Sequence, residues 1–174
     1  MPFFEIIGVV STWKNFNIAG AFLAHENEES YVWAIEQLEK LFILVQREPI
    51  CLVTDREKAL MNAIQHIFPK AKVHLCRRHI RTNIDDYAKK RVGHERGRTF
   101  SSACMTLFRE ESEAGYESRL KKLELKWEKN PQLVQYLKRS WLNPYKERIV
   151  SVWTSSYFSL DTTTTNRLVN CVIL

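Results

Sequence analysis

The stretch PICLVTDREKALMNAIQHIFPKAKVHLCRRHIRTNI, residues 49–84, decides the fold class of this chain. Ile50–Thr54 is a short, continuous apolar run, which is typical of a strand buried on both faces. Apolar side chains recur at helical spacing over Arg56–Phe68. A second short strand, Lys72–Leu75, and a helix, Cys76–Lys90, follow. Strand, helix, strand and helix in this order predict a parallel α/β layer.

The segment before this stretch predicts an antiparallel addition to the sheet. Phe3–Ser11 and Phe16–Leu23 are rich in β-branched and aromatic residues, and a short polar turn separates them. They therefore predict a β-hairpin. From Tyr31 to Val45 the apolar positions fall at helical spacing, and Glu28 and Glu29 suit the start of that helix.

After Val92 the hydrophobic pattern changes from alternating strands and helices to helices. Between Phe100 and Trp153 the patterns are helical, with almost no strand signal. We therefore predict three parts: a sheet-bearing core over residues 1–92, a helical subdomain over 93–160, and a return segment over 161–174. The Trp and Tyr residues of the helical part could stack on nucleic-acid bases, but such residues at helical spacing are more often core, and we favour core.

Composition narrows the functional class. The chain has 174 residues, 45% of them hydrophobic and 26% charged, which is ordinary for a globular domain. No apolar run approaches the ~20 residues of a membrane span. The N-terminus lacks the basic region and cleavage site of a signal peptide. The four cysteines show no disulfide-framework spacing, so reduced thiols inside the cell are expected. No glycine-rich phosphate loop or hydrolase motif points to a small-molecule substrate.

The positive charge is concentrated in one segment. The whole chain carries +6, and Lys70–Arg98 alone holds ten basic and three acidic residues. One interpretation is a surface that meets nucleic-acid phosphates. The other is a solvated helix face, and from the sequence the two are equally plausible. The candidate phosphate-binding residues are Lys70, Lys72, Arg77, Arg78, Arg81, Lys89, Lys90 and Arg91.

Asp55 is the best candidate for catalytic chemistry. It follows a buried strand and precedes a helix, where α/β sheets place their active sites. It could be one ligand of a divalent metal ion. It could also cap the following helix, as could Thr54, and on spacing alone the cap is the commoner role.

Cys76 and His79 form a CxxH pair at the end of a strand and the start of a helix. The pair could be half of a zinc site, but a closed site needs four ligands, and no second pair stands at suitable spacing. A buried thiol and a hydrogen-bonded histidine are therefore favoured.

Taken together, three stretches resemble the MULE (Mutator-like element) transposase domain. Residues 1–38 look like that family's hairpin and first helix, and residues 49–84 look like its second-aspartate strand and CxxH segment. SWLNPYKERIVSVW, residues 140–153, followed by TTTTNR, resembles the region before its last catalytic acid. The middle stretch is the most specific, because TDRE, a helix ending in FP, and LCxxHI stand at the family's spacing.

The resemblance implies an RNase H-like mixed sheet with an all-helical insertion. It also implies phosphodiester cleavage and strand transfer by three carboxylates that hold two Mg²⁺ or Mn²⁺ ions. Asp55 corresponds to the family's second acid, and Cys76 and His79 correspond to its CxxH motif. The strand that carries the first acid would precede Met1, and Val169 stands where the last acid is expected.

These departures predict a chain that keeps the family fold but does not cleave DNA, because one carboxylate holds Mg²⁺ weakly. The missing central strand would leave Phe3–Ser11 and Ile50–Thr54 without their shared partner, which predicts low stability. The alternative function is a non-enzymatic DNA-binding or protein-interaction module. The resemblance implies DNA as partner and a nuclear location, and it leaves homo-oligomerisation open.

Overall fold

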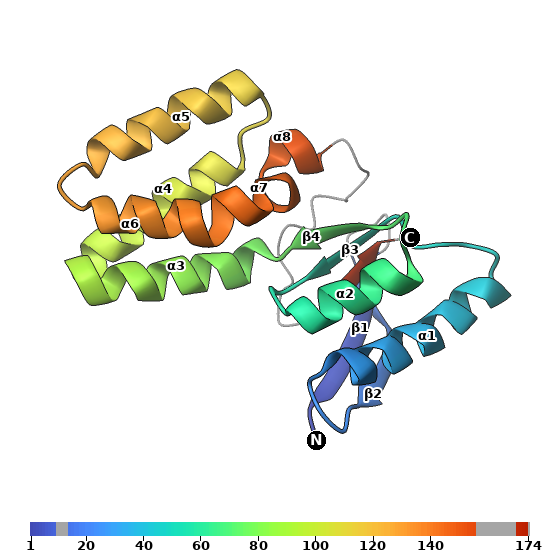
Figure 1. Cartoon of the computed structure of the whole chain (residues 1–174). Helices are drawn as coiled ribbons and strands as arrows, with labels where there is room; N and C mark the ends of the chain where they lie inside the picture. Colours follow the sequence, from blue (N-terminus) through green and yellow to red (C-terminus); the bar gives the residue numbers. More distant parts are fainter. Residues whose placement is uncertain (10–13, 156–169, 174) are drawn as a thin grey trace. The chain divides into compact units, whose positions relative to one another are not determined.

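The computed structural model describes residues 1–9, 14–155 and 170–173, which form two compact units (Figure 1). The first unit comprises Met1–Cys76 and Tyr157–Leu174, and the second comprises Arg77–Ser156. The boundary therefore lies at Cys76, whereas the sequence placed the change of hydrophobic pattern at Val92. The reason is that the helix after Cys76 packs on the helices that follow it, which a local pattern does not reveal.

The first unit contains five strands and two helices among the described residues. Every element predicted for residues 3–75 is present, close to its expected bounds. The elements are β1 (Phe3–Val9), β2 (Asn15–Phe22), α1 (Glu28–Leu44), β3 (Cys51–Thr54), α2 (Lys58–Ile67), β4 (Lys72–Leu75) and β5 (Asn170–Ile173).

The five strands form one mixed sheet in the order β2-β1-β5-β3-β4. β1 and β2 are antiparallel, which confirms the predicted hairpin, and β3 and β4 are parallel, which confirms the predicted α/β layer. The chain is thus a mixed α/β protein.

The central position of the sheet is occupied, which corrects the expectation that β1 and β3 lack a shared partner. β5 lies between them, parallel to β1 and antiparallel to β3. Its residues pair in register with Ile6–Gly8 on one side and with Cys51–Val53 on the other. Because both neighbours bond to β5, the backbone groups that we expected to be unpaired have partners over this stretch.

Aromatic contacts anchor the helices of the first unit to each other and to the sheet. The ring of Tyr31 in α1 meets Phe4 of β1 edge-on, with centroids 5.5 Å apart, and Phe42 meets Phe68 at 5.8 Å. Leu38 is 1% exposed. Burying one such side chain contributes roughly 1.5–3 kcal/mol. Asn27 starts α1, because its side chain accepts the amide of Ser30.

Every secondary-structure element of the second unit is a helix over its described residues, as predicted for residues 100–153. Its elements are α3 (Arg77–Val92), α4 (His94–Phe108), α5 (Glu113–Lys126), α6 (Pro131–Leu137), a π-helical turn η1 (Lys138–Leu142), α7 (Asn143–Ile149) and α8 (Ser151–Thr154). Trp127 and Trp141 are buried, which confirms the preference for core over base stacking at these two positions.

Two glycines allow α3 and α4 to pack closely. Gly93 joins the helices with a φ of 83°, in the left-handed region that favours glycine. At Gly97 a Cβ atom would lie 2.7 Å from the backbone nitrogen of Lys89, so only glycine fits there without displacing α3. In the described part of the chain, no helix has the length and apolarity to cross a membrane.

We expect Val172→Pro to destabilise the first unit. Val172 pairs with Gly8 on one side and Leu52 on the other, and proline has no amide hydrogen to donate. Each buried acceptor that loses its donor costs roughly 1–3 kcal/mol. Urea unfolding followed by circular dichroism measures the change, and Val172→Thr, which keeps the amide and the β-branched shape, is the control. Equal stability of the two variants would contradict a central role for β5.

Candidate functional site

Asp55 lies directly after β3, at the carboxyl end of the parallel pair. Its Oδ1 accepts the backbone amide of Glu57 at 3.1 Å and lies 3.4 Å from the Thr54 hydroxyl. The cap of α2 is Glu57, whose carboxylate accepts the amide of Ala59. The structure therefore corrects the idea that Asp55 caps the helix: Asp55 orders the turn before the cap.

Other carboxylates lie close to this turn. Burial, and then the negative charges of Glu26, Glu57 and Asp55, raise the pKa of Tyr31 to about 12. Nevertheless, the residues that the structure describes contain no group of three His, Cys, Asp or Glu side chains that could hold a metal ion. Asp55 is thus a single candidate ligand, and Mg²⁺ needs several oxygen ligands in fixed geometry. The expected last-acid position, Val169, lies outside the described residues.

The two members of the CxxH pair fall on either side of the boundary between the units. Cys76 is fully buried, and its amide donates to the carbonyl of Thr54 at 2.8 Å. His79 lies in the first turn of α3, where its buried Nδ1 makes no hydrogen bond within the described residues. Among the described residues, neither Cys76 nor His79 belongs to a group of side chains that could hold a zinc ion.

A different cysteine–histidine contact exists in the first unit. The Sγ of Cys51 lies 3.4 Å from Nδ1 of His74, and both side chains are buried. Sequence reasoning missed this pair, because it depends on the register of β3 against β4, in which Val53 is opposite His74. The contact satisfies a buried ring nitrogen and is structural.

Arg77, one of the predicted phosphate-binding residues, is buried instead. Its Nε donates to the carbonyl of Ile149 at 2.8 Å, and its Nη2 donates to the hydroxyl of Ser151 at 2.9 Å. Through these two hydrogen bonds the buried Arg77 side chain joins α3 to the α7–α8 segment. Arg77 therefore belongs to the core of the second unit and not to an exposed basic surface.

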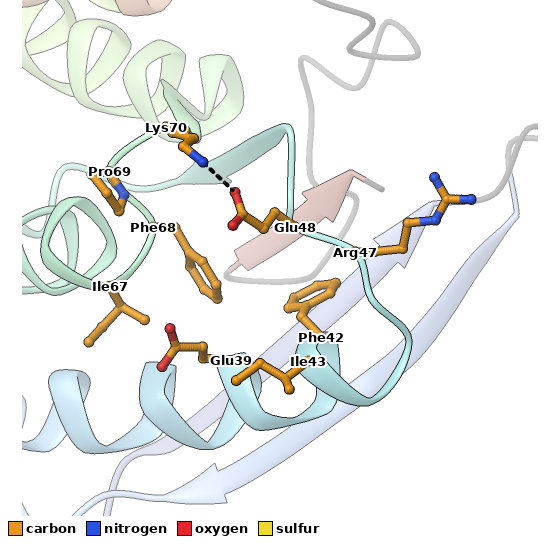
Figure 2. A pocket seen from close by; sticks show the side chains of 9 residues that line it. All are labelled: Glu39, Phe42, Ile43, Arg47, Glu48, Ile67, Phe68, Pro69 and Lys70. Carbon is orange, nitrogen blue, oxygen red and sulfur yellow. Dashed lines mark ion pairs between the residues drawn. The ribbon is translucent and has the colours of Figure 1, made fainter.

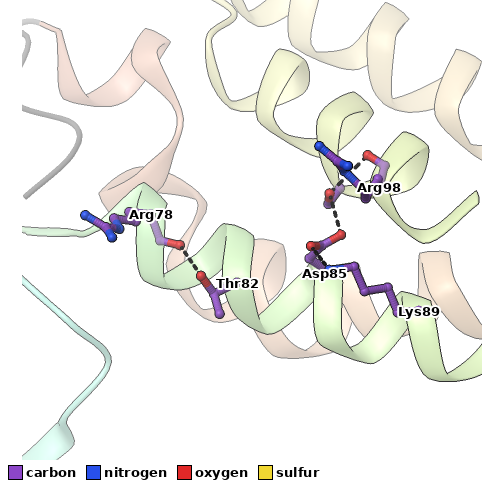
Figure 3. Close-up of polar contacts among 6 residues, drawn as sticks. Arg78, Thr82, Asp85, Lys89 and Arg98 are labelled. Carbon is purple, nitrogen blue, oxygen red and sulfur yellow. Dashed lines mark hydrogen bonds and ion pairs between the residues drawn. The ribbon is translucent and has the colours of Figure 1, made fainter. Parts of the chain in front are cut away.

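The remaining basic side chains of α3 fall into two classes. Lys89 and Arg91 have partners: Lys89 pairs with Asp85 at 2.7 Å, and the Arg91 guanidinium lies 3.5 Å from the centroid of the Tyr87 ring. Arg78, Arg81 and Lys90 are exposed and have no ion pair within 4.0 Å among the described residues. Figure 3 shows Arg78 directed away from the Asp85–Lys89 pair.

Asp85 reduces the positive charge of α3 locally. Partial burial acts to raise the pKa of Asp85, but hydrogen bonds from Lys89 and Ser101 together hold it below its ordinary value. The carboxylate is therefore ionised at neutral pH. Because the Ser101 hydroxyl comes from α4, this carboxylate also links the two helices.

Lys70 and Lys72 lie in the first unit. Lys70 is 3.9 Å from Glu48, and both side chains are well exposed, so this ion pair contributes little. Lys70 stands at the rim of a pocket of about 260 Å³ whose floor includes Phe42 and Phe68 (Figure 2). This pocket lies at the start of β4, whereas Asp55 follows the end of β3. Because the two strands are parallel, the pocket and Asp55 are at opposite ends of the sheet.

Comparison with known proteins finds similarity over the N-terminal part of the chain. Residues 1–83 match the family model of the MULE transposase domain. The chain is 30% identical over 80 residues to Protein FAR1-RELATED SEQUENCE 5 of Arabidopsis thaliana. The aligned stretch covers 46% of this chain, and it spans about a tenth of the length of that curated relative. The region matched by the family model contains β1 to β4, Asp55, and the CxxH pair.

Neighbouring arginines of α3 allow a paired test of these assignments. We expect Arg77→Ala to lower the free energy of unfolding by roughly 1–3 kcal/mol, because two acceptors lose their donor. Arg78→Ala should change it by less than about 0.5 kcal/mol, since that side chain is exposed. Chemical denaturation of both variants gives the comparison. A larger decrease for Arg78→Ala than for Arg77→Ala would contradict the assigned roles.

Proposed function

We propose that this chain is a transposase-derived module that binds DNA through the exposed basic side chains of α3 and does not cleave phosphodiester bonds by itself. The match of residues 1–83 supports the transposase ancestry. The observation that carries the binding proposal is the exposure of Arg78, Arg81 and Lys90 on one helix. Nuclear DNA is the polyanion that this ancestry points to.

The charges on α3 fit a phosphate backbone better than a compact anion. The helix carries six basic and two acidic side chains along 16 residues. Arg78 and Lys90 are 12 positions apart, so about 18 Å of helix separates them at 1.5 Å per residue. Each residue advances about 100° around the helix axis, so Arg78 and Arg81 lie roughly 60° apart and Lys90 lies on the face opposite Arg81. Arg78 and Arg81 can therefore meet neighbouring phosphates together, and Lys90 adds positive charge on the other side of the helix.

The proposed binding mode is independent of DNA sequence. Phosphate contacts fix the position of a protein on DNA but carry no base information, and the exposed cations of α3 are proposed to meet phosphates alone. Lys89 and Arg91 contribute less than their charge suggests, because Asp85 and Tyr87 already engage them. Affinity should therefore depend mainly on the three exposed cations and strongly on salt.

The proposal of no independent cleavage follows from the surroundings of Asp55. In two-metal phosphodiester chemistry several carboxylates hold the ions that activate the nucleophile and stabilise the leaving oxygen. The described residues offer Asp55 without two further ligands at metal-binding distance, and one of its oxygens already accepts the Glu57 amide. We therefore derive no catalytic step at this position.

Neutralising the exposed cations should weaken DNA binding and reduce its salt dependence. We expect the triple change Arg78→Gln, Arg81→Gln and Lys90→Gln to lower the slope of log affinity against log salt by roughly 0.9 for each phosphate that the variant no longer neutralises. Fluorescence anisotropy with a labelled duplex, measured across a salt series, gives this slope.

A matched control removes the same charge from another helix of the same unit. Lys121, Lys122 and Lys126 are exposed on α5, and their change to Gln should leave the slope nearly unchanged. If both triple variants bind equally weakly, the binding reflects net charge and the α3 surface is not the site. Thermal melting of both variants checks that they remain folded.

A cleavage assay tests the second half of the proposal. With Mg²⁺ or Mn²⁺ and a labelled duplex, we expect no product above the protein-free reaction, and Asp55→Asn should behave like the parent chain. Metal-dependent turnover that Asp55→Asn abolishes would show that further ligands assemble around Asp55, and the proposal of inactivity would fail. DNA binding is measured separately, so the proposal of DNA binding and the proposal of no cleavage are tested independently.

A further inference from the structure

The two edges of the sheet differ in how well they are protected. Among the described strands, β4 forms one edge and β2 the other. β4 has four residues and begins with Lys72, and short strands and lysines are common ways to block an edge. β2 reads NFNIAGAF: eight residues with no charge and no proline. A register shift against β1 leaves Ile18 of β2 without a partner in the ladder, and such bulges are one way to protect an edge. Over Ala19–Phe22 the ladder is regular, and this stretch of β2 has no charge and no proline.

The backbone of β2 presents free hydrogen-bonding groups outward. The amide of Leu23 donates to the carbonyl of Pro2 at 2.9 Å, which makes that position a hydrogen-bonded pair of the hairpin. Bonded and non-bonded pairs alternate in an antiparallel ladder, so Ala21 and Ala19 point their amides toward β1. The amides of Gly20 and Phe22 consequently point away from β1, toward the open edge.

Exposed aromatic side chains flank this edge. Phe22 is 66% exposed and Phe16 is 40% exposed, and both lie on β2. Phe22 contacts Phe3 of β1, with ring centroids 5.0 Å apart. Of the eleven large hydrophobic side chains exposed in the described part of the chain, ten lie in the first unit. Five of these ten lie near the end of α1 or between it and β3, namely Leu41, Ile43, Leu44, Val45 and Ile50, whereas Phe3, Phe16 and Phe22 lie on the β1–β2 hairpin. The hairpin belongs to a different unit from the basic helix α3.

We infer that β2 is a self-association surface, on which β2 of a second copy of this chain pairs antiparallel and continues the sheet across a twofold axis. Pairing of identical edges is self-complementary, because each copy offers the same row of donors and acceptors. Like charges opposite each other destabilise a cross-strand pair, and β2 has none. The Phe16 ring lies over Gly8 of β1, so the apolar area that β2 adds at the junction comes mainly from Phe22.

Hydrogen exchange on the unmodified chain tests this inference directly. As the concentration rises, sedimentation should show the mass moving from 20.6 kDa toward twice that value. Over the same range the Gly20 and Phe22 amides should become protected. The Ala19 and Ala21 amides should be protected at every concentration, because β1 already holds them. A monomer at all concentrations, or a dimer in which the Gly20 and Phe22 amides still exchange freely, would overturn the inference.

A matched pair of variants distinguishes edge pairing from nonspecific hydrophobic association. Phe22→Lys places a charge on the edge strand and should abolish the dimer. Phe3→Lys removes the same aromatic contact and adds the same charge, but on the inner strand β1, so the dimer should persist. Absence of the dimer in both variants, or its persistence in both, counts against β2 as the interface. Protection of Gly20 and Phe22 only after another polypeptide is added, with the chain itself monomeric, would also overturn self-association and indicate a strand from a different partner.

Discussion

The hydrogen bonds of one short central strand hold the first unit together. β1 and β3 belong to separate sequence motifs, a hairpin and a strand–helix–strand unit, and they meet only through β5. Both would otherwise face each other with a row of unpaired amides and carbonyls at the centre of the sheet, where water cannot reach them. β5 supplies the missing hydrogen-bond partners, and in the sequence it follows all the helices of the second unit. The sheet therefore forms only when residues more than a hundred positions apart come together.

The second unit is held together by side-chain hydrogen bonds and close helix packing. The Arg77 guanidinium reaches two acceptors from a segment more than seventy residues later, and its planar fork satisfies both with a single side chain. Close packing of α3 on α4 depends on the missing side chain of Gly97. These contacts fix one side of α3 inside the unit and leave Arg78 and Lys90 in solvent. The exposed cations are thus held on a rigid helix, which is a better scaffold for phosphate contacts than a loop.

Asp55 and the cations proposed to bind DNA belong to different units of the chain. Asp55 stands at a strand end in the first unit, in a turn that its own hydrogen bonds order, and the cations lie on α3 in the second unit. A carboxylate in such a turn remains useful without catalysis, because it satisfies a backbone amide before α2. The same reasoning applies to Cys51 and His74, whose contact fills the interior between β3 and β4. Asp55, Cys51 and His74 therefore each make a structural contact that does not require a metal ion.

The amino-acid sequence by itself determined the hairpin, the strand–helix–strand unit with Asp55 at its strand end, and the helical character of residues 100–153. Those features depend on spacings of two, three or four residues, which are visible in a linear pattern. Only the tertiary structure decided that β5 fills the centre of the sheet, that Cys51 meets His74, that α3 belongs to the helical unit, and that Arg77 is buried while Arg78 is exposed. Strand order and the choice of which arginine enters the core depend on contacts between residues far apart in the chain. No local periodicity encodes those contacts, because their free energy exists only once the elements are packed.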